Sequence, residues 1–90
     1  NPGFNRYRFK QFDAGTVALN LMVDQRQIIK VAVYGDLLDD KLARKLESQL
    51  TDASLDKDEL RKRLSKRWLR KVLSDADIET LVDELLIEKQ

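Results

Sequence analysis

Residues 28–40 read IIKVAVYGDLLDD and combine, in this order, the patterns of a strand, a tight turn and a helix start. β-branched residues at every second position up to Val33 give the period of a half-buried strand. Gly35 then permits a backbone conformation that a Cβ would penalise. The carboxylate of Asp36 or Asp39 can accept hydrogen bonds from the first amides of a helix. The chain before this stretch can pair with its strand, and the chain after it can pack on that strand.

Two more strands are expected upstream, at residues 6–12 and 16–24, and the stretch itself supplies a third at 28–35. Alternation places Tyr7 and Phe9 on one face of the first strand, and Val17, Leu19, Leu21 and Val23 on one face of the second. Residues 24–27 contain no glycine, which favours a looser loop than a two-residue hairpin. The three strands together predict an antiparallel meander.

The second half of the chain has helical patterns, expected at residues 39–51, 56–66 and 75–88. Leucine recurs every four residues in the first of them, at Leu38, Leu42, Leu46 and Leu50. The segment around Trp68 can either continue the second helix or form a separate short turn. Strands followed by helices predict an α+β fold, a single domain over residues 6–90 with its helices on one face of the sheet. Residues 1–5 are interpreted as the end of a linker, because proline and glycine discourage regular structure there.

Composition excludes several classes of chemistry. The 90 residues carry a formal net charge of +1, with 42% hydrophobic and 37% charged residues, as expected of one folded domain. Cysteine and histidine are absent, which removes disulfides, thiolates and the commonest metal ligand and general base. We therefore expect no catalytic residue and no metal site.

The sequence has no long apolar run, so we expect no membrane association and a cytoplasmic protein. Its start at Asn1 suggests a segment of a longer chain.

A basic run is the clearest signal for a polyanionic partner. Residues 61–71 hold seven basic residues and no acid, with Trp68 among them, whereas residues 74–90 hold six acids and one base. The candidate basic surface residues are Arg63, Arg67, Arg70 and Lys71. Basic side chains with an interleaved aromatic suit phosphates and stacked bases. The alternative is a solvated helix face whose charge is balanced by the acidic segment that follows.

The outer face of the sheet is a candidate for interdomain contact. Alternation is expected to point Ala18, Met22, Ile28, Ala32 and Tyr34 away from the helices. A solvated face would carry more charge than this one. Met22 and Tyr34 are therefore the candidate contact residues. Gly35 and Asp36 are candidates for shaping the turn beside them, with direct contact to a partner as the alternative.

Five short motifs, in their order and spacing, carry a resemblance to a known family. They are NPGFN at residues 1–5, RF and FDAG at 8–9 and 12–15, VALNLMV at 17–23, and the apolar strand that ends in YGD at 34–36. With these motifs the sequence resembles the C-terminal accessory domain of bacterial lipoate–protein ligase. It departs from the family pattern where two phenylalanines commonly follow Gly-Asp and where glycine is common in two turns. This sequence has Leu37 and Leu38 in place of the two phenylalanines. It has residues 25–27 and residues 51–52, none of them glycine, at the two turns.

The resemblance implies a SufE/NifU-like α+β fold and a parent enzyme that uses ATP, Mg and lipoate. That enzyme forms lipoyl-adenylate and transfers lipoyl to a lysine of an acceptor protein. Its reactive site lies mostly on a larger catalytic domain, fused in cis or a separate chain, which the accessory domain covers and moves against. We therefore expect these residues to bind no cofactor and to catalyse nothing alone. The fold's use as an iron–sulfur scaffold is excluded, because that role needs cysteine.

Two rival functions use the basic segment. One is a small nucleic-acid-binding module built on residues 61–71, although nucleic acid is not the expected partner. The other is an interaction domain that recognises the acidic surface of a lipoyl-acceptor protein through Arg67 and Arg70.

Overall fold

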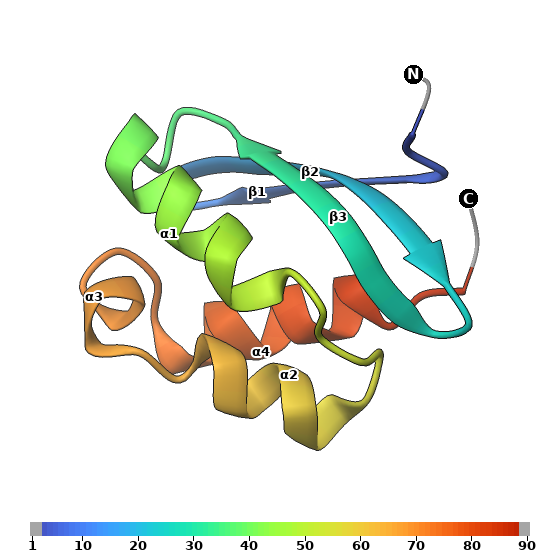
Figure 1. Cartoon of the computed structure of the whole chain (residues 1–90). Coiled ribbons are helices and arrows are strands. Elements are labelled where there is room, and N and C mark those ends of the chain that lie inside the picture. The colour runs from blue at the N-terminus through green and yellow to red at the C-terminus, as the bar shows by residue number, and fades with distance from the viewer. Residues whose placement is uncertain (1–2, 89–90) are drawn as a thin grey trace.

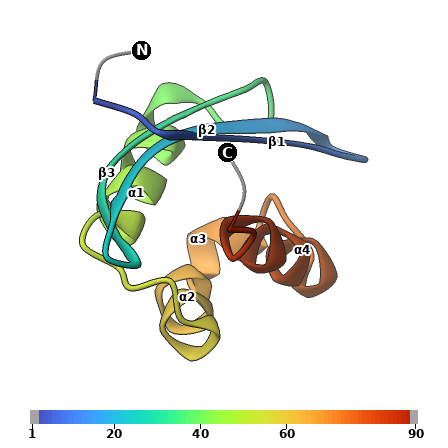
Figure 2. The same ribbon diagram turned by 90° about the vertical axis from the view of Figure 1, so that its right-hand side faces the viewer.

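The computed structural model describes residues 3–88 and shows a three-stranded sheet followed by four helical segments (Figure 1 and Figure 2). The strands are β1 (Arg6–Phe12), β2 (Gly15–Asp24) and β3 (Gln27–Tyr34), and the helices are α1 (Asp40–Leu50), α2 (Lys57–Leu64), α3 (Arg67–Arg70) and α4 (Asp75–Leu85). Neighbouring strands are antiparallel in the order β1-β2-β3. This arrangement confirms the α+β fold with an antiparallel meander followed by helices.

Residues 56–73 contain two helices, α2 and α3, so the segment around Trp68 forms a separate short helix and does not continue α2. Other segments differ from the expected boundaries. Helix α4 ends at Leu85 rather than at residue 88. The linker end expected at residues 1–5 lies partly outside the described residues. Within it, Asn5 already joins the sheet, because its backbone N–H donates to the carbonyl of Leu21 at 2.8 Å.

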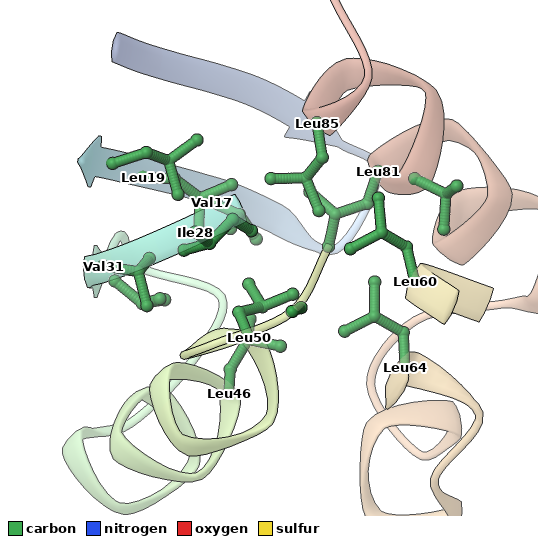
Figure 3. Packing of buried hydrophobic residues seen from close by; sticks show 14 of the residues in the cluster. Val17, Leu19, Ile28, Val31, Leu46, Leu50, Leu60, Leu64, Leu81 and Leu85 are labelled. Atoms are coloured by element: carbon green, nitrogen blue, oxygen red, sulfur yellow. The ribbon is translucent and has the colours of Figure 1, made fainter. Parts of the chain in front are cut away.

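The inner face of β2 provides the centre of the core. Val17, Leu19, Leu21 and Val23 are all buried, which confirms the alternation predicted for this strand. Figure 3 shows Val17 and Leu19 in a cluster with leucines from α1, α2 and α4. Leu46 and Leu50 of α1 are fully buried in it. Truncation of such a leucine to alanine typically costs about 2–5 kcal/mol.

A β-bulge overturns part of the outer face expected from alternation. Met22 pairs with Lys30, but Val23 pairs with Ile28, so Ile29 is an extra residue in β3. The bulge turns Ile28 into the core, where it is fully buried, and leaves Ile29 45% exposed. The expectation that Ile28 points outward is therefore wrong, because strict alternation fails at the bulge.

The β2–β3 connection is a tight hairpin, although its sequence predicted a looser loop. Asp24 pairs with Gln27, so only Gln25 and Arg26 form the turn, with φ values of 51° and 59°. Both residues occupy the left-handed region that such two-residue turns require and that glycine usually supplies. The turn is tied to the following chain, since the Leu55 backbone N–H donates to the Arg26 carbonyl at 2.8 Å.

Side chains from α1 form hydrogen bonds with the edge of β3 that does not pair with β2. The Val33 backbone N–H donates to the Glu47 carboxylate at 2.8 Å, and the Val33 carbonyl accepts from Arg44 at 2.7 Å. Arg44 and Glu47 themselves form an ion pair at 2.9 Å. Further along the same edge, Ile28 donates its N–H to the carbonyl of Ala53 at 2.8 Å. These contacts occupy edge groups that could otherwise pair with a foreign strand.

Candidate functional site

The outer face of the sheet carries three large aromatic side chains in the open. Tyr7, Phe9 and Tyr34 are 52%, 49% and 46% exposed. Strand pairing places Phe9 and Tyr34 on either side of Ala18, because Ala18 pairs with both. Ala18 is only 4% exposed although it points outward between these two large residues.

The same face continues along the strands in two further rows. Tyr7, Asn20 and Ala32 form the next row, and the Asn20 amide donates to the Tyr34 hydroxyl at 3.0 Å. Met22 pairs with Lys30 beyond them. We call Tyr7, Phe9, Ala18, Asn20, Met22, Ala32 and Tyr34 the outer face. Met22 and Tyr34 thus lie on this face as the sequence predicted, with Met22 half-buried.

Lys30 borders the outer face but is drawn towards the N-terminal segment. Its ammonium lies 4.9 Å from the centroid of the Phe4 ring, a cation–π contact. The outer face as defined carries three aromatic side chains, two alanines, one amide and one methionine, and no carboxylate. Exposed aromatic clusters of this kind are typical of protein interfaces rather than of solvated sheets.

Gly35 ends β3 in a conformation that only glycine adopts readily. Its φ is 126°, and a Cβ there would collide with the backbone carbonyl of Thr16. Gly15 faces the same corner, where a Cβ would lie 2.7 Å from the Asp36 carboxylate. The backbone N–H of Leu37 donates to the Thr16 carbonyl at 3.1 Å. Because neither glycine has a Cβ, the start of β2 can lie close to the start of the β3–α1 connection. We call Gly15, Thr16, Gly35 and Asp36 the glycine corner.

Asp36 ties this corner together and does not cap the helix. Its carboxylate accepts from the Thr16 backbone N–H at 2.6 Å and from the Thr16 hydroxyl at 3.0 Å. These hydrogen bonds, the backbone one first, lower the pKa of Asp36. The helix cap is Asp39, whose carboxylate accepts from the backbone N–H of Leu42 at 2.8 Å. Of the two aspartates that the sequence offered as caps, Asp39 therefore caps α1.

The predicted basic surface is divided by the structure. Arg63 donates to the Glu59 carboxylate at 2.8 Å and to the carbonyls of Gln49 and Thr51 at the end of α1. It therefore joins α2 to α1. Arg70, by contrast, donates to the hydroxyl of Ser65 at 2.9 Å.

The two remaining basic candidates, Arg67 and Lys71, lie in or directly after α3. Both side chains are exposed. Within residues 3–88 neither has an ion-pair partner. Arg67, Arg70 and Lys71 thus stay together on the surface, whereas Arg63 has a separate role within the fold.

Sequence reasoning missed Arg8, which is only 6% exposed on the inner side of β1. Its guanidinium donates to the carbonyl of Glu84 at 3.0 Å and to that of Ile87 at 2.6 Å. A cation at the carbonyl end of α4 also suits the helix dipole. Burial, followed by the charge of Arg6, lowers the pKa of Arg8, and Glu84 opposes that change. The only signal in the sequence was a basic residue between two aromatic ones.

No group of three His, Cys, Asp or Glu side chains among residues 3–88 is placed to hold a metal ion. In the same part of the chain, no helix has the length and apolar character needed to cross a membrane.

These features define an α+β domain with a fixed glycine corner and an exposed aromatic face. A family model described as bacterial lipoate protein ligase C-terminus matches residues 1–85, and the chain belongs to this family. No curated protein gives a significant match. Among solved structures, the chain is similar to the crystal structure of P. falciparum LipL1 in complex with lipoate, with a TM-score of 0.67 and 23% sequence identity. The similarity covers 96% of this chain and 25% of that chain, so this chain spans about a quarter of that protein's length.

Proposed function

We propose that this domain is the accessory domain of an ATP-dependent lipoate–protein ligase and that it docks on the catalytic domain through its outer face. In this function it supports the formation of lipoyl-adenylate and catalyses nothing by itself. The catalytic domain is either fused to it or a separate chain. Lipoyl-acceptor proteins are partners of the complete enzyme.

The observation that carries this proposal is the exposed aromatic face of a domain that belongs to a ligase family. Tyr7, Phe9 and Tyr34 each leave about half of their surface uncovered on a rigid three-stranded sheet. Their burial against another domain would remove apolar area from water, which stabilises a complex by about 25 cal/mol per Å² before the costs of association. Aromatic side chains on a sheet also lose little conformational freedom on docking.

The glycine corner supports the same proposal. Gly35 and Asp36 follow Tyr34 directly, and the Asp36–Thr16 hydrogen bonds fix the backbone at this end of the outer face. A fixed backbone presents Tyr34 in one position, so docking does not have to order it. We therefore assign Gly35 and Asp36 a positioning role and Tyr34 and Met22 a contact role.

ATP, Mg²⁺ and lipoate belong to the catalytic domain in this proposal. When bound there, they supply the chemistry of adenylate formation. The domain described here contributes a surface that covers that site and keeps water from it.

The test measures lipoyl-adenylate formation from ATP and lipoate by the catalytic domain of a ligase of this family, with and without this chain. The proposal predicts that the chain raises the rate strongly and that Met22→Glu with Tyr34→Glu loses this effect. Arg67→Glu is the control, because it lies on α3 outside the outer face, and it should act as wild type. An unchanged rate on addition of the wild-type chain would contradict the proposal.

A further inference from the structure

A second surface, on the helical side of the molecule, carries cations without matching acids. We call it the basic corner. It consists of one residue of α1, one of α2 and four in or beside α3, namely Lys45, Lys62, Lys66, Arg67, Arg70 and Lys71. All except the half-buried Lys66 are exposed. Within residues 3–88 none of the six forms an ion pair.

The acidic helix α4 leaves the basic corner uncompensated. Glu79 of α4 binds Arg61 through its carboxylate at 2.5 Å and Lys57 at 3.6 Å, and Asp83 also lies 3.6 Å from Lys57. The hydrogen bond from Arg61 lowers the pKa of Glu79. The acids of α4 thus neutralise one side of α2 and do not reach the basic corner. The expectation that the acidic segment balances the whole basic run therefore holds only for its first residue, Arg61.

The fold brings the six cations together from separate elements. Lys62 and Lys66 line a hollow of about 350 Å³ together with Gln49, Glu59 and Arg63. The Glu59 carboxylate is already paired with Arg63 at 2.8 Å, so it does not neutralise the two lysines. Lys45 of α1 lies 5.6 Å from the centroid of the Trp68 ring in α3. Arg67 and Lys71 follow at a spacing of one helical turn. A partner that lies across this corner would therefore meet cations from α1, α2 and α3 at once.

The chemistry of the corner favours carboxylates over a nucleic acid. Trp68 packs against the core and is approached by Lys45, so its ring does not form an open stacking platform. The exposed aromatic residues Tyr7, Phe9 and Tyr34 belong to the outer face of the sheet instead.

We propose that the basic corner binds a carboxylate-rich surface of a partner protein. The proposal goes beyond the docking function and uses a different surface. Figure 2 shows the strands as one layer with α2 and α3 on one side of it. The strand register and the exposure of Tyr7, Phe9 and Tyr34 place the outer face on the opposite side of the sheet. The domain can therefore contact the catalytic domain and an acidic protein at the same time.

Fluorescence anisotropy with two labelled probes of equal charge, a polyglutamate peptide and an oligothymidylate, tests this inference. The wild-type chain should bind the peptide more tightly, and added salt should weaken that binding. Arg67→Glu with Arg70→Glu should weaken it about tenfold, because two attractive contacts become repulsive. Lys10→Glu with Lys30→Glu is the charge-matched control outside the corner and should bind nearly as wild type. Circular dichroism verifies that all variants are folded.

Two results would overturn the inference. One is tighter binding of the oligothymidylate, which would identify the corner as a nucleic-acid surface. The other is an equal loss of peptide binding in both double variants, which would show that net charge alone is responsible. Neither result depends on the catalytic domain, so a failure here is distinguishable from a failure of the docking proposal.

Discussion

The carboxylate of Asp36 accepts two hydrogen bonds from Thr16, one from its backbone N–H at 2.6 Å and one from its hydroxyl at 3.0 Å. The backbone N–H of Asp36 donates in return to the same hydroxyl at 3.2 Å. Two residues that are twenty positions apart in the chain thereby join the start of β2 to the end of β3. This pair fixes the corner from which Tyr34 is presented on the outer face.

The first prediction concerns the pH dependence of stability. The pKa of Asp36 is lowered in the folded chain, so its contribution is present above its unfolded pKa and is lost as pH falls through the folded value. The free energy of unfolding should therefore fall below about pH 4, the ordinary range of an aspartate. Asp36→Asn should reduce this fall when urea denaturation is measured at several pH values. Asp13→Asn, in the β1–β2 turn, is the control, and an identical slope in both variants would contradict the assignment.

The second prediction concerns Gly35. Gly35→Ala should lower the free energy of unfolding by about 1–3 kcal/mol, because it adds a Cβ in a strained conformation against the Thr16 carbonyl. Thermal unfolding followed by circular dichroism measures the change. The variant should also bind the catalytic domain more weakly than wild type, and the loss of affinity should exceed what the smaller fraction of folded protein accounts for. Unchanged stability would show that this corner adapts to a side chain.

The third prediction concerns the buried guanidinium of Arg8. Arg8→Met keeps most of the side-chain volume but removes the donors to the carbonyls of Glu84 and Ile87. The Glu84 carbonyl then keeps the Ile87 backbone N–H at 3.3 Å, and the Ile87 carbonyl keeps Arg6 at 3.4 Å. Each lost hydrogen bond to a charged donor costs about 1.5–3 kcal/mol. We expect a loss of about 2–4 kcal/mol and faster hydrogen exchange at the end of α4. Exchange that stays as slow as in wild type would mean that α4 is held without Arg8.

The fourth prediction is a stabilising substitution. Gln25 has a φ of 51°, a region that costs a residue with a side chain about 1–2 kcal/mol. Gln25→Gly removes this strain at some cost in chain entropy, so the free energy of unfolding should rise by about 0.5–1 kcal/mol. In a domain of this size that corresponds to a rise in Tm of several degrees. A lower Tm than wild type would contradict the turn geometry.

The sequence was sufficient where one regular pattern determined the structure. The alternation of Val17, Leu19 and Leu21 predicted the buried face of β2, and the four-residue recurrence ending at Leu50 predicted the buried face of α1. Tyr34 was also placed correctly on the outer face. In these elements a side chain points either into the core or towards solvent, and the periodicity of apolar residues is sufficient to predict which.

The sequence was insufficient where a distant partner determined the local structure. Ile28 and Ile29 are chemically alike, and only the bulge opposite Val23 decides which of them is buried. Arg8 points inward because the carbonyls at the end of α4 accept from it, although its neighbour Phe9 is the more apolar residue. Asp36 binds Thr16 across the sheet and leaves the cap of α1 to another residue. Such choices depend on contacts between segments that are far apart in the chain.

The most direct test of the docking account is the affinity of this chain for the catalytic domain of a ligase of this family, measured by isothermal titration calorimetry. Met22→Glu with Tyr34→Glu should weaken binding about 30-fold or more while the circular dichroism spectrum stays unchanged. Loss of a buried aromatic contact costs about 2 kcal/mol at an interface, and each 1.4 kcal/mol is tenfold in affinity. Equal affinity of the folded double variant and the wild-type chain would contradict docking through the outer face.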